Sequence, residues 1–120
     1  MAKKILVVDD EYDIRESVKT VLAHEGYVVR TAVNGEDFLK TVEKVKPDLV
    51  ILDILMPGLT TKEILGKLKE KKGSYKIMFL SVVRVSDEEM ENLKKLGNVV
   101  GYMTKPFDID KLTGTVKKFF

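Results

Sequence analysis

Hydrophobic and polar positions along this chain follow two alternating patterns. Short apolar runs rich in β-branched residues predict five strands, over residues 5–8, 27–31, 49–52, 77–81 and 99–103. Between them, apolar residues recur at helical spacing and predict five amphipathic helices, over residues 14–22, 38–45, 64–68, 90–96 and 109–119. Strand and helix therefore alternate from one end of the chain to the other.

Polar residues at the borders of these segments support the pattern. Ser86 followed by Glu89 predicts a capping box at the start of the fourth helix, and Asp108 can cap the fifth. The pairs Asn34-Gly35 and Pro47-Asp48 predict turns on either side of the second helix.

The strands themselves indicate the fold class. Their apolar runs, such as residues 50–52, are continuous, which suits a parallel sheet that is covered on both faces. Right-handed crossovers then give a three-layer, doubly wound α/β domain. In such sheets a functional site lies beyond the carboxyl ends of the strands, so we expect the functional residues of this chain there.

Composition narrows the function classes. The chain has 21 Lys and Arg residues against 19 Asp and Glu residues, a net charge of +2, which favours neither nucleic acid nor a membrane surface as a partner. Cysteine is absent, which excludes disulfides and thiol catalysis and fits a reducing cytoplasm. The apolar runs are too short to cross a membrane, and no linker or repeat interrupts the chain. We therefore expect a cytoplasmic protein with one domain over residues 1–120.

Three aspartates follow predicted strands and suggest a metal site. Asp9 and Asp10 come directly after the first strand, and Asp53 follows the third. Clustered carboxylates repel one another unless a cation compensates them. Oxygen ligands of this kind are preferred by Mg²⁺, and Lys105 after the fifth strand offers a fixed ammonium at the same edge. We expect Mg²⁺ as a cofactor.

The same edge of the sheet suits the transfer of a phosphoryl group. Ser81 ends the fourth strand and adds a hydroxyl donor to the aspartates and to Lys105. Such a set can neutralise and orient a phosphoryl group while it is transferred. Asp53 is the candidate nucleophile, because aspartyl phosphates are a known class of covalent intermediate.

Three ordered motifs now give a resemblance to a known family. They lie at residues 6–11, which end in Asp9-Asp10-Glu11, at residues 48–58 around Asp53, and at residues 101–107, which end in Lys105-Pro106-Phe107. The chain resembles the receiver domain of two-component response regulators over nearly its whole length. The resemblance implies a flavodoxin-like fold with five parallel strands in the order 2-1-3-4-5.

The resemblance also implies roles for the candidate residues. Asp53 would accept a phosphoryl group from a phosphohistidine of a sensor histidine kinase or phosphotransfer protein. Asp10, Asp53 and the Leu55 carbonyl would bind Mg²⁺ directly, with Asp9 acting through a water. Lys105 would pair with the phosphoryl oxygens. The chain would catalyse its own phosphorylation and slow dephosphorylation without being an enzyme in any other sense.

A switch in conformation is implied as well. Ser81 would move toward the phosphoryl group and Tyr102 would turn inward behind it, which changes the surface of the fourth helix, fifth strand and fifth helix. The Lys105-Pro106 bond is expected to be cis. Output would pass to a downstream protein target, without direct nucleic-acid contact or membrane insertion, from a monomer or a phosphorylation-dependent dimer.

Three positions depart from the family pattern. Val82 stands after Ser81 where a small residue is usual, so we expect a more shielded phosphoryl group and slower hydrolysis. Residues 59–61 replace the usual sequence before the third helix, which leaves its start open. Residues 97–101 are one residue longer than usual before the fifth strand, and we expect a reshaped output surface there.

The sequence leaves three other functions to consider. An unphosphorylated pseudo-receiver that serves only as an interaction module is the main alternative. A phosphohydrolase with an aspartyl nucleophile would carry a second aspartate where Leu55 stands. A flavin-binding module would need a loop rich in glycine and hydroxyl groups in place of Asp9-Asp10-Glu11.

Overall fold

The computed structural model describes residues 2–54, 56–71, 75–81 and 86–120. Its strands are β1 (Lys4–Val8), β2 (Val28–Ala32), β3 (Leu49–Asp53), β4 (Lys76–Ser81) and β5 (Val99–Thr104). Its helices are α1 (Tyr12–His24), α2 (Gly35–Val45), α3 (Thr61–Glu70), α4 (Asp87–Leu96) and α5 (Ile109–Lys117). Within these residues, none of the helices is both long enough and apolar enough to cross a membrane.

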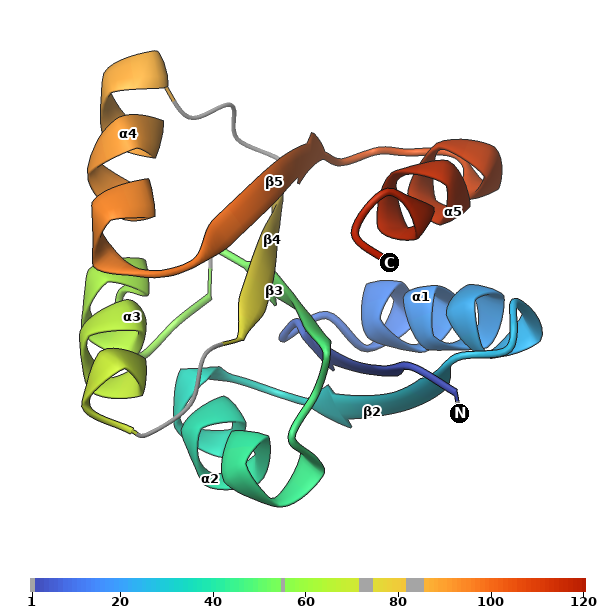
Figure 1. The fold of residues 1–120 in the computed structure, drawn as a ribbon, viewed down its shortest axis with the longest axis horizontal. Coiled ribbons are helices and arrows are strands. Elements are labelled where there is room, and N and C mark those ends of the chain that lie inside the picture. Colours follow the sequence, from blue (N-terminus) through green and yellow to red (C-terminus); the bar gives the residue numbers. More distant parts are fainter. Residues whose placement is uncertain (1, 55, 72–74, 82–85) are drawn as a thin grey trace.

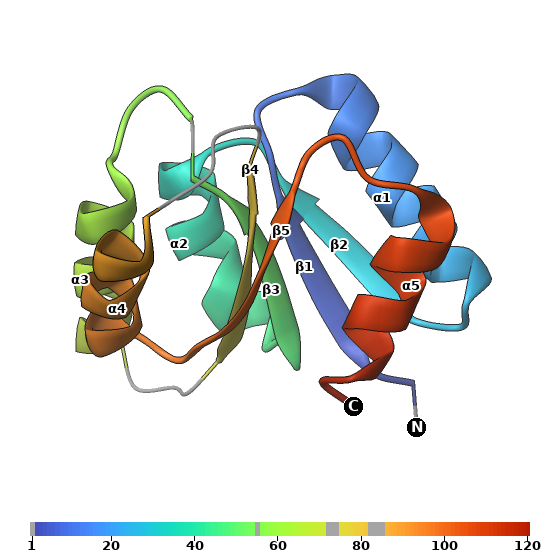
Figure 2. The same cartoon turned by 90° about the horizontal axis from the view of Figure 1, so that it is seen from above.

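All the strands form one parallel sheet. Their order is β2-β1-β3-β4-β5, and every neighbouring pair runs parallel. Figure 1 shows the helices surrounding this sheet, and Figure 2 shows α1 and α5 on one face with α2, α3 and α4 on the other. The three-layer α/β architecture and the alternation of elements predicted from the sequence are confirmed, and so is the strand order implied by the family resemblance.

Alternation along each strand divides the core into two halves. In β3, Val50 and Leu52 belong to the buried cluster that also contains residues of α2, α3 and α4. Their neighbours Leu49 and Ile51 belong to the second cluster, which contains residues of α1 and α5. Successive side chains of a strand point to opposite faces, so a strand that is covered on both sides must be apolar at every position.

The sequence at the start of α2 was interpreted as a turn, and this was wrong. Asn34 is the N-cap residue of α2, and its side chain accepts a hydrogen bond from the backbone N–H of Asp37. Gly35 is the first helical residue. A β-carbon at Gly35 would lie 2.6 Å from Cδ1 of Ile64, so a glycine here allows α2 to approach α3 closely.

A capping box that the sequence analysis missed resolves the start of α3. The Thr60 side chain accepts a hydrogen bond from the Glu63 backbone, and the Glu63 side chain accepts one from the Thr60 backbone. These reciprocal bonds satisfy free N–H groups of the first turn. The helix therefore begins at Thr61.

The predicted caps of the last two helices are present. The Ser86 side chain accepts a hydrogen bond from the Glu89 backbone, which is one half of the predicted capping box. The Asp108 side chain accepts a 2.6 Å bond from the backbone N–H of Lys111 at the start of α5. Both helices thus begin where the sequence predicts.

An irregularity interrupts the pairing of β5 with β4. Ile77 pairs with Val99, but the next residue of β4, Met78, pairs with Gly101. Val100 is therefore the additional residue of a β-bulge, which lets the strand absorb an insertion and recover its register. A β-carbon at Gly101 would lie 2.7 Å from Cζ of Phe119, so the C-terminal segment packs closely on the strand beside the bulge.

The end of α2 offers a stabilising substitution. Lys46 follows the helix with a φ of 50°, in the left-handed region that disfavours side chains. We expect Lys46→Gly to raise the free energy of unfolding by about 1 kcal/mol, measured by urea denaturation. The matched control is Lys44→Gly in the last turn of the same helix, which is expected to lower it by about 1 kcal/mol. A loss of stability in Lys46→Gly would contradict this account of the helix end.

Candidate functional site

Four buried polar residues meet at the carboxyl edge of the sheet. Asp9 follows β1, Asp53 ends β3, Ser81 ends β4 and Lys105 follows β5. These four are the polar or charged residues that are buried in the described part of the chain. The predicted convergence of these residues from distant parts of the sequence is confirmed, as expected for the carboxyl ends of parallel strands.

Lys105 is surrounded by acidic side chains. Its ammonium nitrogen lies 2.7 Å from Oδ2 of Asp9 and 3.5 Å from Oδ2 of Asp53. Oε1 of the exposed Glu11 lies 3.9 Å away. The side chains of Asp9, Asp53 and Lys105 are 5% exposed or less. Breaking a buried ion pair is costly, so this ammonium holds the two aspartates together at the edge of the sheet.

The acidic surroundings change the proton affinity of Lys105. Burial by itself would lower the pKa of the ammonium group. The hydrogen bond to Asp9 and the charges of Asp53, Asp9 and Glu11 together outweigh burial and raise the pKa above its usual value. Lys105 is therefore a permanent cation at physiological pH, available to pair with an anion at this site.

The three aspartates form a set suited to a divalent cation. Asp9, Asp10 and Asp53 each offer one carboxylate oxygen, and these oxygens all lie within 4.8 Å of one another. Mg²⁺ binds oxygens at about 2.1 Å, so two ligands of one ion lie at most about 4.2 Å apart. Small side-chain adjustments, or a water in place of one direct bond, bring the set within reach of one ion. The predicted Leu55 carbonyl ligand lies outside the described residues.

Hydrogen bonds from backbone and side-chain groups hold the loop that carries Asp9 and Asp10. The Asp9 N–H donates to the Ala32 carbonyl at 3.2 Å, which continues the pairing of β1 with β2. The Glu11 N–H donates to Oδ1 of Asp9 at 2.9 Å. The Arg15 guanidinium donates to the Asp9 carbonyl at 2.8 Å. Arg15 was not predicted from the sequence. The sequence indicates only a basic residue one helical turn after Asp9-Asp10-Glu11.

The predicted switch residues lie on β4 and β5. Ser81 is fully buried, and its carbonyl accepts a 2.7 Å hydrogen bond from the Lys105 N–H, which ties the ends of β4 and β5 together. Tyr102 is half-buried and packs against the core cluster shared by α2, α3 and α4. The Lys105-Pro106 bond is cis, as predicted. Val82, the proposed shield of the phosphoryl group, lies outside the described residues.

A family comparison agrees with this geometry. A model of the response regulator receiver domain matches residues 5–117. The chain belongs to this family. A receiver domain is a phosphorylation-activated signalling switch with a phosphoacceptor role, and the pseudo-receiver alternative is not favoured. Receiver domains bind Mg²⁺ at an acidic pocket, and the three-aspartate cluster forms such a pocket here.

Two bacterial relatives match this receiver domain over nearly its whole length. It is 39% identical over 119 residues to sporulation initiation phosphotransferase F of Bacillus subtilis, a match that covers 99% of this chain and 94% of the relative. It is 42% identical over 120 residues to the alkaline phosphatase synthesis transcriptional regulatory protein PhoP of the same organism. That match covers 98% of this chain and 48% of PhoP, so the chain spans about half of that relative.

Solved structures share the fold of this receiver domain. Chemotaxis protein CheY4 of Vibrio cholerae superposes with a TM-score of 0.88 at 30% identity, and the match covers 100% of both chains. The response regulator TrrA from Thermotoga maritima, in complex with Mg²⁺ and BeF, has a TM-score of 0.81 at 42% identity. That match covers 98% of this chain and 99% of TrrA.

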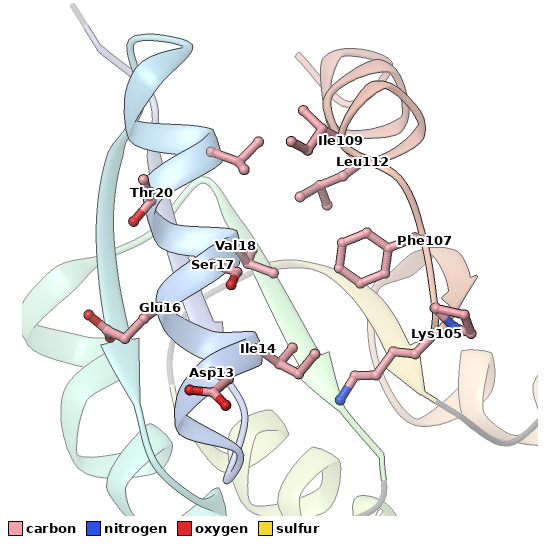
Figure 3. A pocket seen from close by; sticks show the side chains of 12 residues that line it. Asp13, Ile14, Glu16, Ser17, Val18, Thr20, Lys105, Phe107, Ile109 and Leu112 are labelled. Atoms are coloured by element: carbon pink, nitrogen blue, oxygen red, sulfur yellow. The ribbon is translucent and has the colours of Figure 1, made fainter.

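A groove beside the receiver's acidic pocket separates α1 from α5. It has a volume of about 700 Å³, and its lining includes Lys105. Figure 3 shows Ile14 and Val18 of α1 on one side and Phe107 and Leu112 on the other. The Lys105 side chain lies at the end of the groove and points away from α5, toward the carboxyl edge of the sheet. The groove thus connects an apolar surface to the charged site.

Proposed function

We propose that Asp53 is the residue of this receiver domain that accepts the phosphoryl group. The observation that carries the proposal is the position of its carboxylate, which is 3% exposed and lies 3.5 Å from the Lys105 ammonium. Of the three clustered aspartates, Asp53 lies at the end of the central strand β3, while Asp9 forms the shortest ion pair with Lys105. Asp9 is thus engaged in holding the cation and Asp10 is exposed, which leaves Asp53 as the buried candidate nucleophile.

The transfer step balances with the residues at hand. A carboxylate oxygen of Asp53 attacks the phosphorus of a phosphohistidine, an O–P bond forms, and the P–N bond breaks. The leaving imidazole keeps the electron pair of that bond and takes up a proton. Lys105 shifts from the aspartates toward the phosphoryl oxygens as their charge builds up. Asp9, Asp10 and Asp53 would hold Mg²⁺, which would neutralise the anionic oxygens during transfer.

The signal then passes to the sheet edge beyond Asp53. We propose that the Ser81 hydroxyl turns toward the new phosphoryl oxygens and that Tyr102 packs more deeply behind it. Tyr102 is half-buried, so its environment can change in either direction. It lies on β5, so this motion would alter the surface formed by α4, β5 and α5. A phosphoryl group that binds one packing better than the other shifts the population between them.

The groove between α1 and α5 supports a protein as the phosphodonor. A sensor histidine kinase or phosphotransfer protein must bring its phosphohistidine to the carboxyl edge of the sheet. Ile14, Val18 and Phe107 provide an apolar contact surface next to Lys105. We propose that such a partner binds here, in the cytoplasm, and that output passes to a second protein through the α4, β5 and α5 surface.

A small phosphodonor tests the proposed chemistry, because the receiver itself is proposed to supply the catalytic groups. Incubation of the purified chain with acetyl phosphate and Mg²⁺ should add one phosphoryl group, seen by intact mass, which disappears slowly after the donor is removed. Chelation of Mg²⁺ should abolish the addition, because the clustered carboxylates would then repel the anionic donor. Equal addition with and without chelator would contradict the role of the metal. No addition despite bound Mg²⁺ would contradict self-catalysis.

A further inference from the structure

Arg15 folds back from α1 onto the acidic loop of the site. Its Nη1 atom donates a 2.8 Å hydrogen bond to the Asp9 carbonyl. Its guanidinium carbon lies 5.5 Å from the ring centroid of Tyr12, and its side chain is 12% exposed. Its Nε atom lies 4.0 Å from the carboxylate of Glu16, so among the described residues the hydrogen bond to the backbone is the short polar contact of this side chain.

A basic residue is unusual in the first turn of a helix. Arg15 is the fourth residue of α1, and the first turn of a helix favours acidic side chains over basic ones. A cation there opposes the helix dipole, which costs a few tenths of a kcal/mol. The charge-assisted hydrogen bond to a carbonyl outweighs this cost. Arg15 therefore stabilises the loop that carries Asp9 and Asp10 more than it stabilises α1.

The peptide unit that Arg15 holds is the one between the two acidic residues. The Asp9 carbonyl belongs to the peptide bond that joins Asp9 to Asp10, so its orientation fixes where both side chains leave the backbone. Asp9 has a second anchor, because its carboxylate binds Lys105 at 2.7 Å. Asp10 is exposed, and within the described residues its carboxylate has neither a hydrogen bond nor an ion pair. Its position depends on the backbone that Arg15 holds.

We infer that Arg15 is a positioning residue that sets the Mg²⁺ affinity of the site through the backbone between Asp9 and Asp10. The inference rests on the proposed function, in which these aspartates bind Mg²⁺. The guanidinium stays charged at all relevant pH values, so its hold on the carbonyl does not depend on pH. Groups that orient metal ligands without contacting the metal typically contribute tenfold or more to metal affinity.

The test compares Mg²⁺ binding by three variants of the full chain, measured by calorimetric titration and by the amide NMR shift of Asp10. We expect Arg15→Met to bind Mg²⁺ about tenfold more weakly than wild type. Arg15→Lys, which keeps the charge but has a shorter reach, is expected to bind about threefold more weakly. Arg30→Met is the matched control and should stay within twofold. Arg30 is exposed on β2, and its guanidinium donates a 3.3 Å bond to the Val29 carbonyl.

A second readout separates positioning from loss of structure. The Mg²⁺ concentration that gives half the maximal rate of phosphorylation by acetyl phosphate should rise in Arg15→Met, and additional Mg²⁺ should restore the rate. If Arg15→Met does not give a folded amide spectrum, Arg15→Lys decides alone. Mg²⁺ binding within twofold of wild type in the folded variants would overturn the inference while leaving the proposed function intact. A wild-type chain that binds no Mg²⁺ would overturn both.

Discussion

Replacing Lys105 with methionine is expected to lower the free energy of unfolding by about 3 kcal/mol in buffer without Mg²⁺. The side chain is 5% exposed and pairs with Asp9, which is 1% exposed. Methionine has a similar length but leaves Asp9 and Asp53 as buried carboxylates without their cation. Two buried carboxylates without a compensating cation repel each other and destabilise the folded state. Urea denaturation at neutral pH measures the difference.

Two controls identify the charge as the cause. Lys71→Met removes an exposed pair in which the ammonium lies 3.3 Å from Glu43, and should cost less than about 1 kcal/mol. Mg²⁺ should stabilise Lys105→Met more than wild type, because the ion replaces the missing cation. A cost for Lys105→Met as small as that for Lys71→Met would contradict the account of a buried, charge-compensated cluster.

The pH dependence of this effect has a defined sign. The pKa of Lys105 is raised in the folded state, so its contribution is fully present below the pKa of an unfolded lysine, about 10.4. The contribution falls only as the pH rises through the higher folded pKa. The difference in stability between wild type and Lys105→Met should therefore not change from neutral pH to about pH 10, and should shrink above that range.

The fold was predictable because its strongest signals are local. A strand buried on both faces must be apolar throughout, and β3 shows this in its residues Leu49 to Leu52. The helices between the strands show one apolar stripe each, which marks their buried side. Local patterns cannot predict the strand order, because strand pairing joins residues that are far apart in the sequence. The order was implied only by the resemblance to receiver domains.

The errors fall where one residue type serves two local structures. Asn34 and Gly35 are typical of a turn, but asparagine is also a favoured N-cap, and here it begins α2. The sequence indicates one extra residue within residues 97–101 but not the bulge at Val100, because an extra residue in a strand looks like a longer strand. The cap is a local hydrogen bond to Asp37, whereas the bulge depends on the pairing of β5 with β4.

Most of the site could be predicted, because its charged residues directly follow apolar strands. Asp9, Asp53 and Lys105 stand where strand ends meet, and topology alone brings them together. Arg15 could not be found in this way, because it acts through a backbone carbonyl. Every residue carries a backbone carbonyl, so a hydrogen bond from a side chain to a carbonyl cannot be predicted from the residue types. Its role becomes visible only when the direction of the side chain is known.

Replacement of Asp53 by asparagine is expected to abolish phosphorylation by acetyl phosphate altogether. An amide oxygen is a far weaker nucleophile than a carboxylate, and the size of the side chain is unchanged. The matched control is Asp48→Asn at the opposite end of the same strand. Asp48 is exposed and accepts a 2.8 Å hydrogen bond from the Lys4 backbone, which an amide oxygen can also accept. Intact mass should show one phosphoryl group on wild type and on Asp48→Asn, and none on Asp53→Asn.

Locating the phosphoryl group within the wild-type chain tests the central claim most directly. Borohydride reduces an aspartyl phosphate to homoserine and leaves free carboxylates unchanged, so the modified residue is marked before digestion. Peptide mass spectrometry after incubation with Mg²⁺ and acetyl phosphate should find homoserine in place of Asp53 alone. Homoserine in place of Asp9 or Asp10, or a phosphoryl group on His24 or a hydroxyl side chain with Asp53 unmodified, would contradict the account.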